Sequence, residues 1–348
     1  MITDRERVLK SLKWEQPHSL IVESGFSPAT WKKYREALEP VSARMANDFN
    51  VYSGPRKDYD QMPPTYRKDD VFKDAWGCVW ECRVDGMEGI IKHHPLADRW
   101  AGLESYHLPD PLKTADKVPW DQRAFEHELK KNVNDHKYIM GGGDRFWERI
   151  HFLRGYENTM IDLAEGEPRL IKLIERVIEY NLRSIQKFLQ YDEVDCIVFG
   201  DDWGEQNRLM ISPRTWREYF FSGYQAMFQA VKRADRAVYF HTDGYLMPIV
   251  PDLIEAGADI INLQYRPNGI HNIREACLNN VCVSVDIDRQ HFMPWGTPGE
   301  VKDHIREIYT VMEGWNGGLW VKMDVYPDTP LENIIAMCEV FEELRRSG

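Results

Sequence analysis

Two short apolar runs in the middle of the chain, 196–199 and 238–240, end abruptly in polar groups. The groups after the first run are Asp201, Asp202 and Glu205, and those after the second are His241 and Asp243. A histidine with two or three carboxylates suits a divalent ion such as Zn²⁺ that keeps one position open for a reactant. Crowded carboxylates also acquire raised pKa values, which suits general acid–base catalysis. The structural alternative is that each aspartate caps the loop or helix that follows it.

The segment between the two runs indicates how these side chains meet. Ser212-Pro213 is typical of a helix start, and about twenty residues of amphipathic pattern follow. Strand, helix and strand then form a right-handed parallel unit. Both polar groups fall at the carboxyl ends of neighbouring strands, where α/β enzymes build their sites.

Other predicted strands also end in polar side chains, and the chain alternates strands and helices throughout. The further strand ends carry Glu23, Asn262, Gln264, Asp286, Asp288 and Asp324. This alternation predicts one domain over residues 1–348, a distorted (β/α)₈ barrel, with an open doubly wound sheet as the alternative. If the barrel closes, its mouth is acidic with a single imidazole.

An insertion at about residues 50–95 interrupts the alternation. Residues 51–70 are rich in Tyr, Pro and charge, which predicts a long loop or lid. Asp85-Gly86 lies between two β-prone runs and predicts a hairpin.

Side chains two residues apart on a strand share a face, so His241 and Asp243 could chelate one ion together. Trp203 directly follows Asp201-Asp202. We expect Trp203 to stay outside the packed core and to form an aromatic wall for a flat substrate or cofactor.

Composition excludes several classes of function. The 348-residue chain has a formal net charge of −12, which argues against nucleic acid as a partner. Its six cysteines form no CxxC pair, the N-terminus is not an apolar signal region, and no run approaches the length of a membrane span. We therefore expect a cytoplasmic protein with no membrane contact.

Several motifs together resemble the uroporphyrinogen decarboxylase superfamily. They occupy residues 5–10, 152–158, 199–206, 211–220, 240–244, 249–259 and 295–301. The resemblance covers most of the chain and implies a distorted (β/α)₈ barrel. It also implies a choice of activities, because the superfamily contains tetrapyrrole decarboxylases and cobalamin-dependent methyltransferases.

Two departures from the family patterns guide that choice. True uroporphyrinogen decarboxylases carry an arginine-rich segment after the first strand, whereas residues 22–28 here contain no arginine. The zinc methyltransferases carry His-x-Cys and a distant cysteine near the last strand. This chain keeps His241 but has Asp243 and Asp324 at or near the cysteine positions. An oxygen-rich site of this kind suits polarising an ether or hydroxyl oxygen.

The sequence and the resemblance together predict a corrinoid-dependent methyltransferase of the O-demethylase type. It would move a methyl group from a small methoxylated substrate, aromatic or not, to a separate corrinoid protein, and the resemblance alone suggests a homodimer. The alternatives are a metal-independent decarboxylase or lyase and a non-catalytic binding protein. The assigned residues are Asp202, Glu205 and Asp286 for catalysis, Glu23, Asp201, Trp203 and Gln264 for substrate, and His241, Asp243 and Asp324 for zinc.

Overall fold

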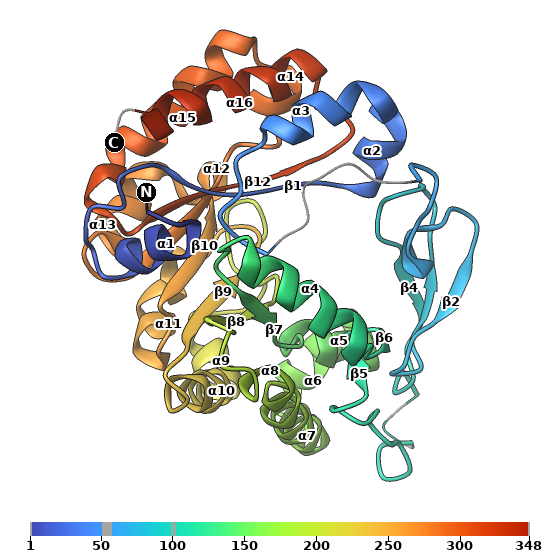
Figure 1. The fold of residues 1–348 in the computed structure, drawn as a ribbon. Coiled ribbons are helices and arrows are strands. Elements are labelled where there is room, and N and C mark those ends of the chain that lie inside the picture. Colours follow the sequence, from blue (N-terminus) through green and yellow to red (C-terminus); the bar gives the residue numbers. More distant parts are fainter. Residues whose placement is uncertain (1, 51–57, 99, 101, 347–348) are drawn as a thin grey trace.

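A seven-stranded parallel sheet forms the centre of the described chain, which in this computed structural model comprises residues 2–50, 58–98, 100 and 102–346. The sheet is curled, and helices surround its outer face (Figure 1). The strands lie in the order β1-β12-β11-β10-β9-β8-β7. Their bounds are β1 Ile21–Phe26, β7 Met140–Gly142, β8 Cys196–Gly200, β9 Ala237–His241, β10 Ile260–Gln264, β11 Cys282–Asp286 and β12 Leu319–Val325.

The predicted barrel architecture is confirmed, but one barrel strand is reduced to a single bridge. Between the edge strands β1 and β7 lies a short segment in which Phe49 pairs in parallel with Tyr138. The backbone N–H of Asp48 donates to the carbonyl of Val22, and that of Tyr138 donates to the carbonyl of Asp48. This segment connects the two edges near the amino ends of the strands. The chain after it, residues 51–57 of the expected loop, lies outside the described residues.

The helices form where the sequence signals them. Pro298–Val311, for example, begins with a capping box in which Thr297 and Glu300 bond reciprocally. The helices are α1 Asp4–Leu12, α2 Pro28–Tyr34, α3 Glu39–Arg44, α4 Gln122–Asn134, α5 Trp147–Arg154, α6 Tyr156–Glu165, α7 Pro168–Ser184, α8 Gln186–Leu189, α9 Pro213–Trp216, α10 Ser222–Lys232, α11 Val250–Ala256, α12 Tyr265–Asn268, α13 Ile270–Cys277, α14 Phe292–Trp295, α15 Pro298–Val311 and α16 Leu331–Arg346. The helical region after Glu167 is divided near Ile185 into α7 and α8.

The insertion forms a small antiparallel sheet of β2 Val71–Lys73, β3 Val79–Glu81 and β4 Ile90–His93, beside the barrel (Figure 1). The turn between β3 and β4 contains the expected Asp85-Gly86 and is clamped at both ends. Lys32 of α2 pairs with Asp85 at 2.6 Å, and Glu88 pairs with Lys117 and lies 3.9 Å from Arg145. A further two-stranded sheet, β5 Thr114–Ala115 and β6 Val118–Pro119, lies nearby. The insertion therefore spans from the element after β1 to the loop after β7.

The barrel interior is layered from apolar to polar toward the carboxyl ends of the strands. The first layer is a cluster with one residue from each strand or its approach, namely Ile21, Tyr138, Cys196, Tyr239, Ile260, Cys282 and Trp320. Residues two positions further along each strand share its inward face. They include Glu23, His241, Asn262, Ser284 and Lys322. The apolar layer thus closes one end of the barrel beneath a polar layer.

Among the helices in the described ranges, none has both the length and the apolar character that crossing a membrane requires.

Candidate metal centre at the barrel mouth

Asp202, His241 and Asp243 converge at the carboxyl ends of β8 and β9. One ligand atom from each lies within 4.8 Å of the others. Nε2 of His241 lies 4.0 Å from Oδ1 of Asp202 and 3.9 Å from Oδ1 of Asp243. These side chains are half-buried, so the group is open to a small molecule from the mouth.

Each member of the group is oriented by a second residue. Nδ1 of His241 is hydrogen-bonded to Oδ1 of Asn262. Gln264 donates to Oδ1 of Asp243 at 2.9 Å, and Arg289 binds the other oxygen of that carboxylate. The backbone N–H of Asp243 donates to Oδ1 of Asp202 at 3.0 Å. Outer partners of this kind hold ligand side chains in one orientation.

Burial and like charge act on the carboxylates of the mouth. Burial, and then the negative charge of Asp243, raise the pKa of Asp202. Burial raises the pKa of Asp286 to about 6, against the opposing effect of Lys322. The like charges of Asp202 and Asp243 therefore repel each other, and Arg289 offsets part of this repulsion at Asp243.

The expectation of a uniformly acidic mouth is wrong, because Lys322 and Arg289 also face it. Nζ of Lys322 lies 2.8 Å from Oε1 of Glu23 and 3.9 Å from Asp324. Burial alone would lower the pKa of Lys322, but the Glu23 carboxylate raises it well above the ordinary value. The lysine is therefore a buried cation within the barrel. Lys322 was not among the residues predicted from the sequence, although it stands at an inward position of the apolar run 319–323.

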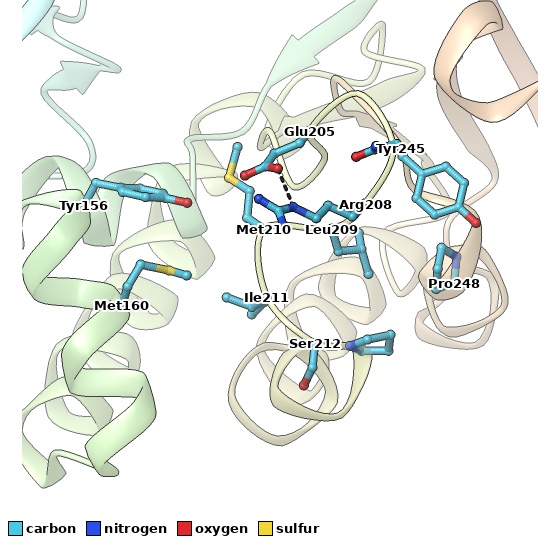
Figure 2. A pocket seen from close by; sticks show the side chains of 12 residues that line it. Tyr156, Met160, Glu205, Arg208, Leu209, Met210, Ile211, Ser212, Tyr245 and Pro248 are labelled. Carbon is cyan, nitrogen blue, oxygen red and sulfur yellow. Dashed lines mark hydrogen bonds and ion pairs between the residues drawn. The ribbon is translucent and has the colours of Figure 1, made fainter.

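Several residues assigned from the sequence lie outside this group. Asp324 was expected as a ligand, but its side chain is 46% exposed and lies toward Lys322, so it is absent from the group of possible ligands. Glu205 pairs with Arg208 at 2.6 Å. It lines a separate cavity of about 630 Å³ between α6 and the loops after β8 and β9, opposite Tyr156 and near Tyr245 (Figure 2).

The expectation that Trp203 forms an exposed aromatic wall is also wrong. Its side chain is fully buried, it stacks on Trp147 with 4.7 Å between ring centroids, and its Nε1–H donates to the hydroxyl of Tyr224 at 2.8 Å. The turn after β8 directs the indole outward, under α10 and α5, rather than into the mouth. An aromatic ring at the mouth comes instead from Tyr326 after β12, which lies against the guanidinium of Arg289.

Asp201 has the structural role that the capping interpretation gives a strand-end aspartate. Its carboxylate accepts the backbone N–H groups of Phe146 and Glu148 at the start of α5, and the hydroxyl of Tyr224 at 2.7 Å. It is 1% exposed. Direct contact between Asp201 and a substrate is therefore blocked.

The remaining assigned residues belong to the network behind the group. Asp286 accepts a hydrogen bond from Asn262 at 2.7 Å. Glu23 accepts from Lys322 and from the hydroxyl of Tyr239 at 2.8 Å. Asn262 connects His241 to Asp286. Its role was not predictable from the sequence, because an asparagine at a strand end gives no signal beyond that of a turn residue.

The fold and the mouth define a (β/α)-barrel protein with a candidate metal centre at the carboxyl ends of its strands. A family model for uroporphyrinogen decarboxylase matches residues 83–344. The chain therefore belongs to the uroporphyrinogen decarboxylase family.

Comparison with solved structures supports the same fold. A structure titled methyltransferase from Methanosarcina mazei has a TM-score of 0.70 and 17% sequence identity, and the match covers 99% of each chain. At this identity the likeness shows the fold alone. A dihydropteroate synthase from Vibrio fischeri ES114 has a TM-score of 0.35 at 16% identity, covering 50% of this chain and 63% of that chain, which is too low to carry an argument. No curated protein sequence matches this chain.

Proposed function

We propose that the protein is a zinc-dependent methyltransferase that demethylates a small methoxylated substrate and passes the methyl group to a separate corrinoid protein. The observation that carries the proposal is the convergence of Nε2 of His241 with carboxylate oxygens of Asp202 and Asp243. The full-length likeness to a methyltransferase fold is in keeping with it.

The chemistry of the donor set fits a divalent ion. Nε2 of His241 is 3.9 to 4.0 Å from the two carboxylate oxygens, which is beyond ordinary hydrogen-bond distance. Two ligands of one tetrahedral zinc ion are about 3.3 Å apart, given metal–ligand distances of about 2.0 Å. Small side-chain shifts would therefore bring all three atoms onto one ion. An ion held by these residues would act as a Lewis acid toward an ether oxygen.

The protein's own residues then have distinct tasks. Asp202, His241 and Asp243 would hold the ion, and the mouth above them, beside Arg289 and Tyr326, would receive the substrate. In the transfer the bond between the methyl carbon and the ether oxygen breaks, and a cobalt–carbon bond forms on the reduced corrinoid. The oxygen keeps the bonding electron pair and takes a proton from water at the mouth.

Metal analysis combined with one variant tests this proposal. We expect one zinc per purified chain, and we expect His241→Ala to lose both the zinc and methyl transfer to cob(I)alamin, followed by its absorbance change with a panel of methoxylated aromatic and aliphatic compounds. Exposed His271 provides the matched control His271→Ala, which should keep both. A metal-free protein that transfers methyl groups would refute the proposal.

A decarboxylase is the second candidate, and one observation favours it. Arg289 at the mouth and Lys322 beneath it are cations that would attract a substrate carboxylate. Carbon dioxide release from a porphyrinogen or a small acid, unaffected by chelators, would select this activity over methyl transfer.

A further inference from the structure

We infer that Asn262 is a positioning residue that sets the tautomer of His241, holding the proton on Nδ1 and leaving the lone pair of Nε2 directed at Asp202 and Asp243. The inference adds a positioning residue to the proposed zinc site, and the functional purpose of this residue rests on the proposed function. It concerns a residue that touches neither the proposed ion nor a substrate.

The hydrogen bonds of Asn262 determine which way its amide faces. Its Nδ2 group is 2.7 Å from the carbonyl oxygen of Ser284 and 2.7 Å from Oδ1 of Asp286. Both partners accept hydrogen bonds, so the two N–H groups of the amide must point at them. A flipped amide would place its oxygen against two acceptors. Oδ1 of Asn262 therefore faces His241.

That orientation decides the state of the imidazole. Oδ1 of Asn262 accepts only, and it is 2.5 Å from Nδ1 of His241. Nδ1 must therefore carry the proton, and in the neutral ring Nε2 then has a free lone pair. The opposite tautomer would set a lone pair on Nδ1 against the amide oxygen. It would also place the Nε2 proton where the proposed ion binds.

Burial of Asn262 and its partners makes each of these hydrogen bonds hard to replace. Asn262 is fully buried, Ser284 is fully buried and Asp286 is 5% exposed, so water cannot replace a lost partner easily. The chain of contacts runs from Asp286 through Asn262 to His241. Outer partners of this type change metal affinity by roughly 10- to 100-fold when they are lost.

The first experiment uses the unaltered protein without metal. We expect the ¹⁵N spectrum of its histidines, recorded near pH 9 where imidazoles are neutral, to show His241 with a protonated Nδ1 and an unprotonated Nε2. The signals of His241 are identified by their absence in His241→Gln. A protonated Nε2 would overturn the inference whether or not the protein binds zinc.

The second experiment compares three variants by zinc competition against a chromophoric chelator. Asn262→Leu removes the acceptor, and we expect zinc affinity to fall about 10- to 100-fold and the Nε2-protonated form to appear. Asn262→Asp keeps an oxygen toward Nδ1 but sets its second oxygen against the acceptors of Ser284 and Asp286, so we expect it to keep the Nδ1-protonated ring of His241 at a cost in folding stability. Asn333→Leu is the control, because Asn333 is equally buried but donates to the backbone of Met293 and Gly296.

The outcomes separate this inference from the proposed function. Unchanged zinc affinity in a folded Asn262→Leu variant would overturn the inference while leaving the zinc site intact. Conversely, a parent protein that binds no zinc but shows the Nδ1-protonated ring would refute the proposed function and uphold the role of Asn262. Should Asn262→Leu fail to fold, the spectrum of the unaltered protein still decides the tautomer.

Discussion

The ammonium nitrogen of Lys322 lies 2.8 Å from Oε1 of Glu23 inside the barrel, and the side chains are 12% and 9% exposed. Breaking a buried pair by removing one partner leaves an uncompensated charge and costs about 3–5 kcal/mol. We therefore expect Glu23→Ala to lower the free energy of unfolding by about 3 kcal/mol or more, measured by urea denaturation.

The matched control for that prediction is a salt bridge on the surface. Lys302 and Glu339 pair on the outside of the barrel with side chains 29% and 45% exposed, so Glu339→Ala should cost less than about 1 kcal/mol. The double variant Glu23→Ala with Lys322→Met should recover part of the loss, because the ammonium group left unpaired by Glu23→Ala is then absent. Equal costs for the two single variants would contradict the assignment of Glu23 and Lys322 as a buried pair.

The composition of the metal group leads to a second prediction. Asp202→Asn and Asp243→Asn should each weaken zinc binding at least about a hundredfold, since losing a ligand costs more than losing an outer partner, whose loss costs roughly 10- to 100-fold. Asp324→Asn should change it little, because Asp324 lies outside the group. Zinc competition titrations measure all three. Loss of zinc in Asp324→Asn alone would restore the ligand set expected from the sequence.

Tyr224 provides a third prediction, which concerns stability. Its hydroxyl accepts from Nε1 of Trp203 and donates to Asp201, and all three residues are buried. Tyr224→Phe leaves a buried donor and a buried acceptor without this partner, so we expect a loss of about 1–3 kcal/mol in the free energy of unfolding. Tyr219→Phe, on the preceding turn, should lie within about 0.5 kcal/mol of the parent. Equal midpoints for the two variants would refute the role of this hydroxyl.

The sequence predicted the strands and most helices because apolar runs, prolines and capping residues act locally. Ser212 with Pro213 starts a helix as expected, and Thr297 with Glu300 forms a capping box at the start of another. The link between β1 and β7 escaped prediction, since it consists of one bridge, at Phe49, formed with a residue far along the chain. Local patterns carry no information about such a contact.

The site was predicted in part for a related reason. The sequence placed His241 and Asp243 together at the end of β9, where the strand stops at His241 and Asp243 follows in the loop, and the parallel neighbour β8 leads to Asp202. The orientation of Trp203 depends on a tight turn and on the packing of Trp147 against it, which no local pattern encodes. Asp324 lies outside the group, and its carboxylate is 3.9 Å from Lys322, two residues before it along β12.

His304 provides a pH-dependent prediction away from the mouth. Its Nε2 accepts the backbone N–H of Asp288 at 3.0 Å, and burial lowers the pKa of His304 to about 4. The pKa of this histidine in the unfolded chain is about 6.5, so between pH 6.5 and 4 the unfolded state binds a proton that the folded state does not bind. Stability must therefore fall as the pH falls through this window, by about 3 kcal/mol from this residue.

Comparing variants isolates that contribution from the other groups that titrate in acid. Gln at position 304 keeps an oxygen for the Asp288 N–H and does not titrate, so His304→Gln should lose less stability than the parent between pH 6.5 and 4. His271 is exposed on the surface and serves as the control, so His271→Gln should follow the parent curve. Urea denaturation at several pH values measures these slopes. Parallel curves for the parent and His304→Gln would show that His304 takes up its proton in the folded state as readily as in the unfolded chain, against its burial beside Asp288.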